Sequence, residues 1–130
     1  MIQLVDPSTD YQTSYLKALA EFAAENRSLE YRGIQSDENF ADYVKRIALF
    51  KKGIGLPEGY IPESVMWLVD GSEFIGEASI RHELTDFLRQ VGGHIGYVIR
   101  PSKRKRGYGK QILKLSLQYI QTLGINSVLL

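Results

Sequence analysis

Apolar positions in the first half of the chain recur at spacings that predict one strand followed by two helices. Residues 2–5 read IQLV, a short apolar run typical of a strand. Residues 11–26 and 37–51 carry apolar residues at helical spacing, with charged residues between them. The apolar positions are Leu16, Leu19, Ala20 and Ala23 in the first helix and Phe40, Tyr43, Val44 and Ile47 in the second. Residues 53–64 are rich in Gly and Pro, which predicts a loop.

The second half of the chain predicts three strands, a helix and a further strand. Residues 64–70 are almost continuously apolar, as in a strand that is covered on both faces. Residues 74–84 follow a DGSE turn and predict the return strand of a hairpin, and residues 94–100 predict another strand. A helix is expected over residues 108–123, before a strand that starts at residues 125–130. Its inner face is predicted to hold Ile112, Leu113, Ser116, Leu117 and Ile120.

The predicted element order is β-α-α-β-β-β-α-β, which indicates a mixed α/β (α+β) sheet. Because one helix connects the last two strands, we expect a parallel pair across that crossover. A chain of 130 residues is expected to form one domain, residues 1–130. An apolar strand that ends at Leu130 without a cap or polar tail further suggests a truncated gene product or a fragment.

Composition narrows the classes of function. Sixteen basic and fifteen acidic residues nearly balance, so the whole chain is not a polyanion binder and any anion site must be local. The chain contains no cysteine, which excludes disulfides, thiolate zinc sites and a cysteine nucleophile, and a reducing, cytoplasmic setting is expected. No apolar run approaches ~18 residues and the N-terminus lacks a signal-peptide pattern, so no membrane span is expected.

A basic segment, RPSKRKRGYGKQIL, lies between a predicted strand and a predicted helix. Its cations are Arg100, Lys103, Arg104, Lys105, Arg106 and Lys110. Gly107 and Gly109 stand at the helix entrance, where backbone N–H groups and the helix dipole favour an anion. The segment fits neither the Walker A loop nor the dinucleotide fingerprint, because Gln111 follows Gly109-Lys110 and Ile112 fills the third glycine position.

Residues 104–109, RKRGYG, match the acetyl-CoA signature of the GNAT N-acetyltransferase family. That signature is Arg or Gln, two residues, Gly, one residue, then Gly or Ala. Pro101 stands three residues before Arg104, as is common in that family, and a strand precedes it. Together with the element order, RHEL followed by GGHIGYVIRPSKRKRGYG resembles a bacterial branch of predicted acetyltransferases.

The resemblance implies a GNAT-like acyl-CoA N-acyltransferase fold and acetyl-CoA as the cosubstrate. The residues whose backbone N–H groups would hold the pyrophosphate are Arg104, Lys105, Arg106, Gly107, Tyr108, Gly109 and Lys110. The strand edge at Tyr97, Val98 and Ile99 would pair with the pantetheine arm in the manner of an added strand. The segment could also be a plain core strand. The two assignments are compatible, because its side chains can pack in the core while its backbone edge binds the pantetheine arm.

Acetyl transfer to an amine requires a base, which in the resembled family is usually a carboxylate or a His. The candidates, in order, are Glu83, His82 and His94, with Glu77 as an additional candidate in mid-strand. The alternatives are that His82 is a satisfied structural histidine and that Glu83 pairs with Arg81 or Arg89. The spacing of the two histidines and Glu83 matches no known metal site, so no metal is expected.

The chain departs from the family at its end. Members usually continue with a further helix and two strands that carry an Asn for the cofactor and often a Tyr that protonates the leaving thiolate. We therefore expect weakened binding and catalysis, and homodimerisation through an exposed sheet edge.

The leading hypothesis is an acetyl-CoA-dependent N-acetyltransferase acting on a primary amine. The alternatives are a CoA-binding module without turnover and, less favoured, a nucleic-acid-binding protein that uses the KRKR run. Residues 25–33 and 53–64 would line the acceptor side, where a peptide, a polyamine or an antibiotic would fit equally well.

Overall fold

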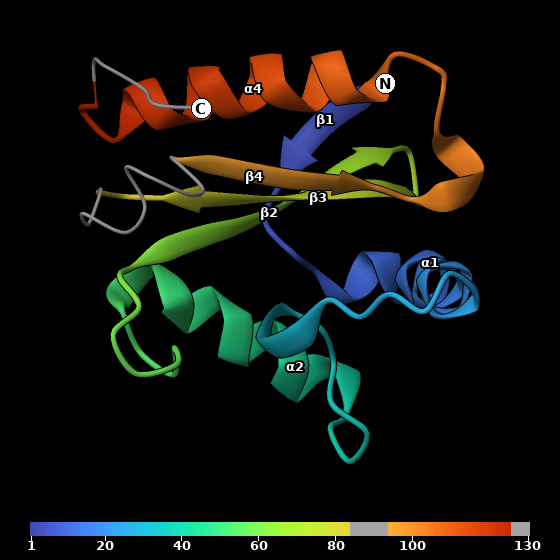
Figure 1. Ribbon diagram of the computed structural model, residues 1–130, viewed down its shortest axis with the longest axis horizontal. Coiled ribbons are helices and arrows are strands. Elements are labelled where there is room, and N and C mark those ends of the chain that lie inside the picture. The colour runs from blue at the N-terminus through green and yellow to red at the C-terminus, as the bar shows by residue number, and fades with distance from the viewer. Residues whose placement is uncertain (84–93, 126–130) are drawn as a thin grey trace.

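A computed structural model describes residues 1–83 and 94–125 of the chain (Figure 1). A mixed α/β architecture places the sheet between two helical layers, with α4 on one side and α1 and α2 on the other. The helices and strands are β1 (Ile2–Val5), α1 (Gln12–Ala24), α2 (Phe40–Ala48), β2 (Glu63–Asp70), β3 (Glu73–Arg81), β4 (Ile95–Ile99) and α4 (Tyr108–Thr122). The predicted order is therefore confirmed from the first strand to the last described helix.

The described strands form one antiparallel sheet in the order β1-β2-β3-β4. Glu77 in the middle of β3 lies opposite Trp67 on β2 and opposite Val98 on β4. β4 thus forms one edge of the described sheet. The predicted strand over residues 125–130, and with it the parallel pair, falls on residues 126–130, outside the described part of the chain.

β2 is covered on both faces, as its continuous apolar sequence predicts. Val65, Trp67 and Val69 belong to an aromatic core beneath α1 and α2. Met66 and Leu68 point the other way, into an aliphatic core covered by α4. The buried side of α4 consists of Ile112, Ser116 and Ile120, with Leu113 and Leu117 packed at its border, as predicted. Because alternate residues of a strand face opposite sides, β2 contributes different side chains to the aromatic core and to the aliphatic core.

Apolar spacing located α1 correctly but did not identify its buried face. Leu16 is 41% exposed, and both predicted alanines are exposed as well. The buried residues of α1 are Tyr15, Ala18 and Phe22. The Tyr15 ring stacks on Trp67 at 4.6 Å, and its hydroxyl hydrogen-bonds the Tyr43 hydroxyl at 2.7 Å. An aromatic ring buries about 150–250 Å², more than Leu offers, and the partnered hydroxyl removes the cost of burying it.

β3 and β4 approach one another closely at Gly76. A Cβ atom on Gly76 would lie 2.6 Å from the Val98 carbonyl oxygen, which is closer than real Cβ atoms come. Glycine is therefore required here by the spacing of the two strands. The residue holds β4 against β3 directly beside Glu77, the next residue along the strand.

Candidate functional site

The basic segment forms a turn that presents backbone N–H groups at the start of α4. Lys105 has a φ of 64°, and Gly107, which caps the helix, has a φ of 83°. Gly109 lies in the first turn of the helix. Within the described residues, the N–H groups of residues 105–110 have no hydrogen-bond acceptor, whereas that of Arg104 donates to the Pro101 carbonyl at 3.4 Å. Unpaired N–H groups at a helix start form a site suited to a phosphate.

Half of the cations in this segment are neutralised by acidic residues of other elements. Their ion pairs are Arg100 with Glu21 at 2.7 Å, Lys103 with Glu73 at 2.9 Å and Arg104 with Glu25 at 2.7 Å. Lys105, Arg106 and Lys110 are exposed and have no ion pair among the described residues. The local positive charge available to a ligand therefore comes from these three side chains.

The outer edge of β4 leads from this turn into the sheet. The Arg81 N–H donates to the His94 carbonyl and the Arg100 N–H donates to the Ile75 carbonyl, both at 2.8 Å. In an antiparallel ladder the hydrogen-bonded residues alternate, so the backbone groups of Tyr97 and Ile99 point to the outer edge. Those of Val98 point toward β3. Of the residues predicted to pair with the cofactor, Tyr97 and Ile99 thus present backbone groups outward.

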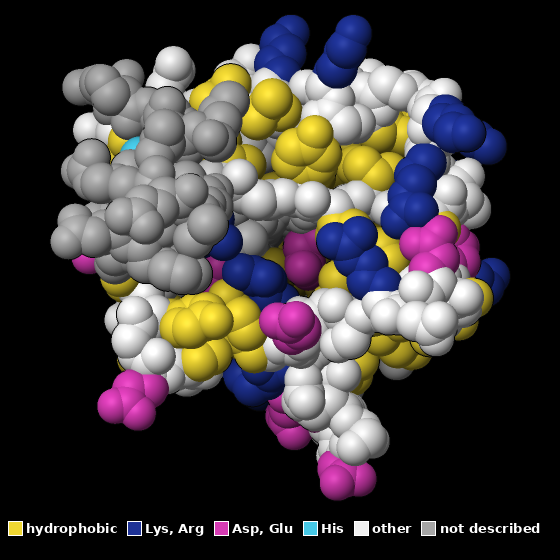
Figure 2. All heavy atoms as spheres, in the orientation of Figure 1, with side chains coloured by type: hydrophobic (Ala, Val, Ile, Leu, Met, Phe, Trp, Pro, Cys, Tyr) yellow, Lys and Arg dark blue, Asp and Glu magenta, His cyan; other side chains and the backbone are white. Residues whose placement is uncertain are grey.

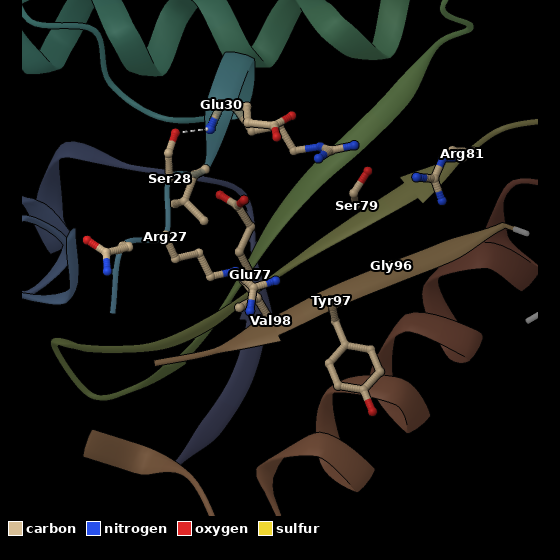
Figure 3. Close-up of a pocket in the computed structure, with 12 residues that line it drawn as sticks. Arg27, Ser28, Glu30, Glu77, Ser79, Arg81, Gly96, Tyr97 and Val98 are labelled. Carbon is tan, nitrogen blue, oxygen red and sulfur yellow. Dashed lines mark hydrogen bonds between the residues drawn. The ribbon is translucent and has the colours of Figure 1, made fainter. Parts of the chain in front are cut away.

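A cavity of about 590 Å³ lies between β3, β4 and the segment that follows α1 (Figure 3). Its lining residues are Asn26, Arg27, Ser28, Leu29, Glu30, Arg32, Glu77, Ser79, Arg81, Gly96, Tyr97 and Val98. Figure 2 shows dark blue Lys and Arg side chains around a magenta acidic side chain in the middle of this face. The volume is within the range of small-molecule sites. The predicted acceptor segment 25–33 does line it.

Glu77 places a buried carboxyl group in this cavity. Only 4% of the residue is exposed, and Figure 3 shows the side chain rising from β3 into the hollow. The indole N–H of Trp67 donates to its Oε1 at 3.1 Å. Burial raises the pKa of Glu77 to about 7, an effect that Arg32 and the Trp67 hydrogen bond oppose and Glu63 reinforces. Near neutral pH this carboxyl can therefore both accept and release a proton.

A second buried carboxyl, Glu63, lies behind the first and is fully engaged. Arg32 donates from Nε and from a terminal nitrogen to Glu63 Oε2, each at 3.3 Å. The Tyr31 hydroxyl donates to Glu63 Oε1 at 2.6 Å, and the Ser79 hydroxyl donates to Oε2. Burial and the neighbouring Glu63 raise the pKa of Tyr31. Because its oxygens accept these bonds, Glu63 positions Arg32 and Ser79 around the cavity.

The three bases favoured from the sequence lie outside the cavity lining. The His82 ring nitrogen Nε2 hydrogen-bonds Ser64 Oγ at 2.8 Å, and Ser64 Oγ in turn contacts the Tyr119 hydroxyl at 2.9 Å, on the α4 side of the sheet. Burial lowers the pKa of His82. Glu83 is exposed past the end of β3, and His94 is buried at the start of β4. The residue that the structure brings beside β4 is Glu77, the additional candidate.

Sequence reasoning missed Glu63, and it included Arg27 and Arg32 only as members of the predicted acceptor segment 25–33. Glu63 carried one usable signal, since it is a charged residue directly before an almost continuously apolar strand. Within that segment no signal singled out either arginine, because the segment has no regular periodicity.

Within the described ranges 1–83 and 94–125, no cluster of His, Asp or Glu side chains could hold a metal ion. None of the helices in those ranges is both long and apolar enough to cross a membrane.

Comparison with protein families identifies the family of this chain. A family model described as an acetyltransferase (GNAT) domain matches residues 9–130, which is nearly the whole chain. A search of curated proteins found no matching relative.

Proposed function

Because the chain belongs to the GNAT acetyltransferase family, we propose that it transfers an acetyl group from acetyl-CoA to a primary amine, with Glu77 as the general base. The observation that supports this assignment is the buried Glu77 carboxyl in a cavity beside β4, the strand at one edge of the described sheet. A base works best when its pKa lies near the operating pH, and burial brings the pKa of Glu77 to about 7.

The fit of coenzyme A rests on two adjacent features of the chain. The N–H groups of residues 105–110 have no acceptor in the part of the chain that the structure describes, and they suit its pyrophosphate. The outward backbone groups of Tyr97 and Ile99 suit the amide groups of its pantetheine arm, which would add to the sheet edge. Acetyl-CoA supplies the acetyl group as a thioester.

Groups of this chain would supply the base and the hydrogen-bond donor that acetyl transfer requires. The acceptor arrives as an ammonium ion, and the Glu77 carboxylate takes up one proton from it. The amine nitrogen attacks the carbonyl carbon, a C–N bond forms and the C–S bond breaks. An outward N–H of Tyr97 or Ile99 stabilises the charge that develops on the carbonyl oxygen. As the amide forms, the nitrogen loses its second proton to solvent water. Coenzyme A leaves as its thiolate, which takes up a proton from the same water.

The test is release of free thiol by the full chain with acetyl-CoA and a panel of amines. We expect turnover to rise with pH through about 7 as Glu77 ionises. Glu77→Gln keeps an oxygen for Trp67 but cannot take up a proton, so kcat should fall by about 10²–10⁴-fold and the pH dependence should disappear. The thermal shift caused by coenzyme A should be retained.

Glu83→Gln is the matched control, because it removes the same charge from an exposed position outside the cavity lining. Its activity should stay within about twofold of the parent. Loss of activity in Glu83→Gln but not in Glu77→Gln would assign the base to Glu83. A thermal shift with coenzyme A and no thiol release with any amine would instead indicate a binding module without turnover.

A further inference from the structure

Guanidinium groups approach the cavity from the segment that follows α1 and from the end of β3. Arg27 follows α1, Arg32 lies in the 3-10 turn Glu30–Arg32, and Arg81 ends β3. The opposing carboxylates of the lining are Glu30 and Glu77. The cavity is thus an unusual place for a ligand that brings only positive charge.

Arg32 and Arg81 have defined positions in the cavity wall. Arg32 is held by Glu63, so these two charges offset each other. The Arg81 guanidinium lies over Gly96, with its nitrogens 3.8 and 4.0 Å from a Cβ placed on that glycine. This contact sets a cation directly above β4, close to the backbone that the proposed function assigns to the acetyl group.

Arg27 differs from both because its side chain has no ion pair or hydrogen bond among the described residues. It is exposed to solvent, and Figure 3 shows it reaching from the segment after α1 toward the wall that holds Glu77 and Val98. Glu30 lies three residues further along the same segment, where its own N–H donates to the Ser28 hydroxyl at 2.8 Å. Arg27 is therefore an available bidentate donor beside the proposed base.

We propose that the acceptor is a small amine that also carries a carboxylate, and that Arg27 binds this carboxylate while the amine faces Glu77. This inference rests on the proposed function. An acceptor ammonium is matched by the Glu77 carboxylate, so any second cationic group of the acceptor would meet arginines. A carboxylate in the same place gains two charge-assisted hydrogen bonds. A polyamine or a polycationic antibiotic is disfavoured for the same reason.

Kinetics with matched amines tests this acceptor class. The kcat/KM values of ω-amino acids of increasing length are compared with those of alkylamines of the same length, with spermidine as the polycation. We expect at least one amino acid to exceed its matched alkylamine by about 10–100-fold, the range for a hydrogen-bonded charged group. Arg27→Gln should abolish this advantage by lowering the amino-acid value by about 10–100-fold more than the alkylamine value, and Arg27→Lys should restore part of the advantage.

Lys17→Gln is the control, since Lys17 is an exposed cation on α1 outside the cavity lining and the variant changes net charge equally. It should keep the advantage of the amino acid. Equal or better turnover of spermidine or of the alkylamines, or an equal loss for both amine types in Arg27→Gln, would overturn the proposal.

A binding measurement separates this inference from the proposed function. Calorimetric titration compares an N-acetyl ω-amino acid with the neutral N-alkylacetamide of the same length. Tighter binding of the carboxylate that is lost in Arg27→Gln supports the carboxylate site even where no thiol is released. Equal binding of the two compounds overturns the site whether or not acetyl transfer occurs.

Discussion

The turn at residues 104–110 and the cavity beside β4 differ in the source of the polar groups that a ligand would meet. In the turn, backbone N–H groups of consecutive residues face solvent, and glycine sets their geometry. In the cavity, side chains from three distant segments meet. The lining carboxyl of Glu77 is buried, and a second buried carboxyl, Glu63, lies behind it. The turn therefore depends on local conformation, and the cavity depends on how the sheet and helices pack.

The two regions also differ in how much hydration their polar groups lose on folding. Backbone N–H groups at a helix start remain exposed in the folded chain and lose little hydration. A carboxyl such as Glu77 is taken out of water and is stabilised only in part by Trp67 and Arg32. We thus expect the ionised Glu77 carboxyl to lower the free energy of unfolding through its burial. Substitutions in the turn should change that free energy mainly through backbone conformation.

The largest expected effect is on the pH dependence of stability. The pKa of Glu77 rises from 4.5 in the unfolded chain to about 7 in the folded one, so folding favours its protonated form. The free energy of unfolding should therefore fall as pH rises from 4.5 to 7, by ~3 kcal/mol in total. Glu77→Gln should remove this decline and be more stable than the parent at pH 8. Urea denaturation at several pH values measures it, and parallel curves for parent and variant would contradict it.

A smaller effect should distinguish the two glycines of the turn. Ala at Gly107 must adopt the left-handed φ of 83°, so it should lower the free energy of unfolding by ~1–2 kcal/mol. Ala at Gly109 has a Cβ contact of 3.5 Å to the Tyr97 hydroxyl and should raise helix stability by ~0.5–1 kcal/mol.

The Gly109 variant should nevertheless bind coenzyme A about tenfold more weakly, because its methyl group stands where the backbone must approach the pyrophosphate. Urea melts and calorimetry with coenzyme A measure the two quantities separately. Unchanged affinity in Gly109→Ala would show that the anion does not approach this turn.

The smallest effect concerns the charges around the turn. Lys105→Gln should weaken coenzyme A binding about two- to fivefold at low salt, because this exposed cation has no ion pair among the described residues. Lys103→Gln should have less effect, since Lys103 is directed toward Glu73. Affinities at several salt concentrations compare the two, and an equal slope for both variants would count against this distinction.

The turn could be predicted from the sequence because its residues are consecutive. Glycines, cations and the start of an apolar helix stand together in fourteen letters, and the order of the elements follows from periodicity. The buried face of α1 could not be predicted, because Tyr15 prevails over Leu16 only when Trp67 and Tyr43 are in place.

The cavity could be predicted only in part. The hairpin was located correctly, so His82 and Glu83 were placed near β4 along the chain. Whether either residue can act as the base depends on the side of the sheet that its side chain faces. The His82 ring lies on the α4 side, where it hydrogen-bonds Ser64. Glu77 stands opposite Val98 only through the register of β3 and β4, which is set by packing at Gly76.

Successive residues of β4 face opposite sides of the sheet, so this strand borders the cavity on one side and α4 on the other. Gly96 and Val98 line the cavity, while Tyr97 turns its ring away toward α4, 47% exposed, with its hydroxyl beside Gly109 (Figure 3). An inhibitor that joins an acceptor analogue to coenzyme A would therefore have to bend around the outer edge of β4. The length of its linker at that bend, rather than the affinity of either half, should decide whether one molecule can occupy both regions.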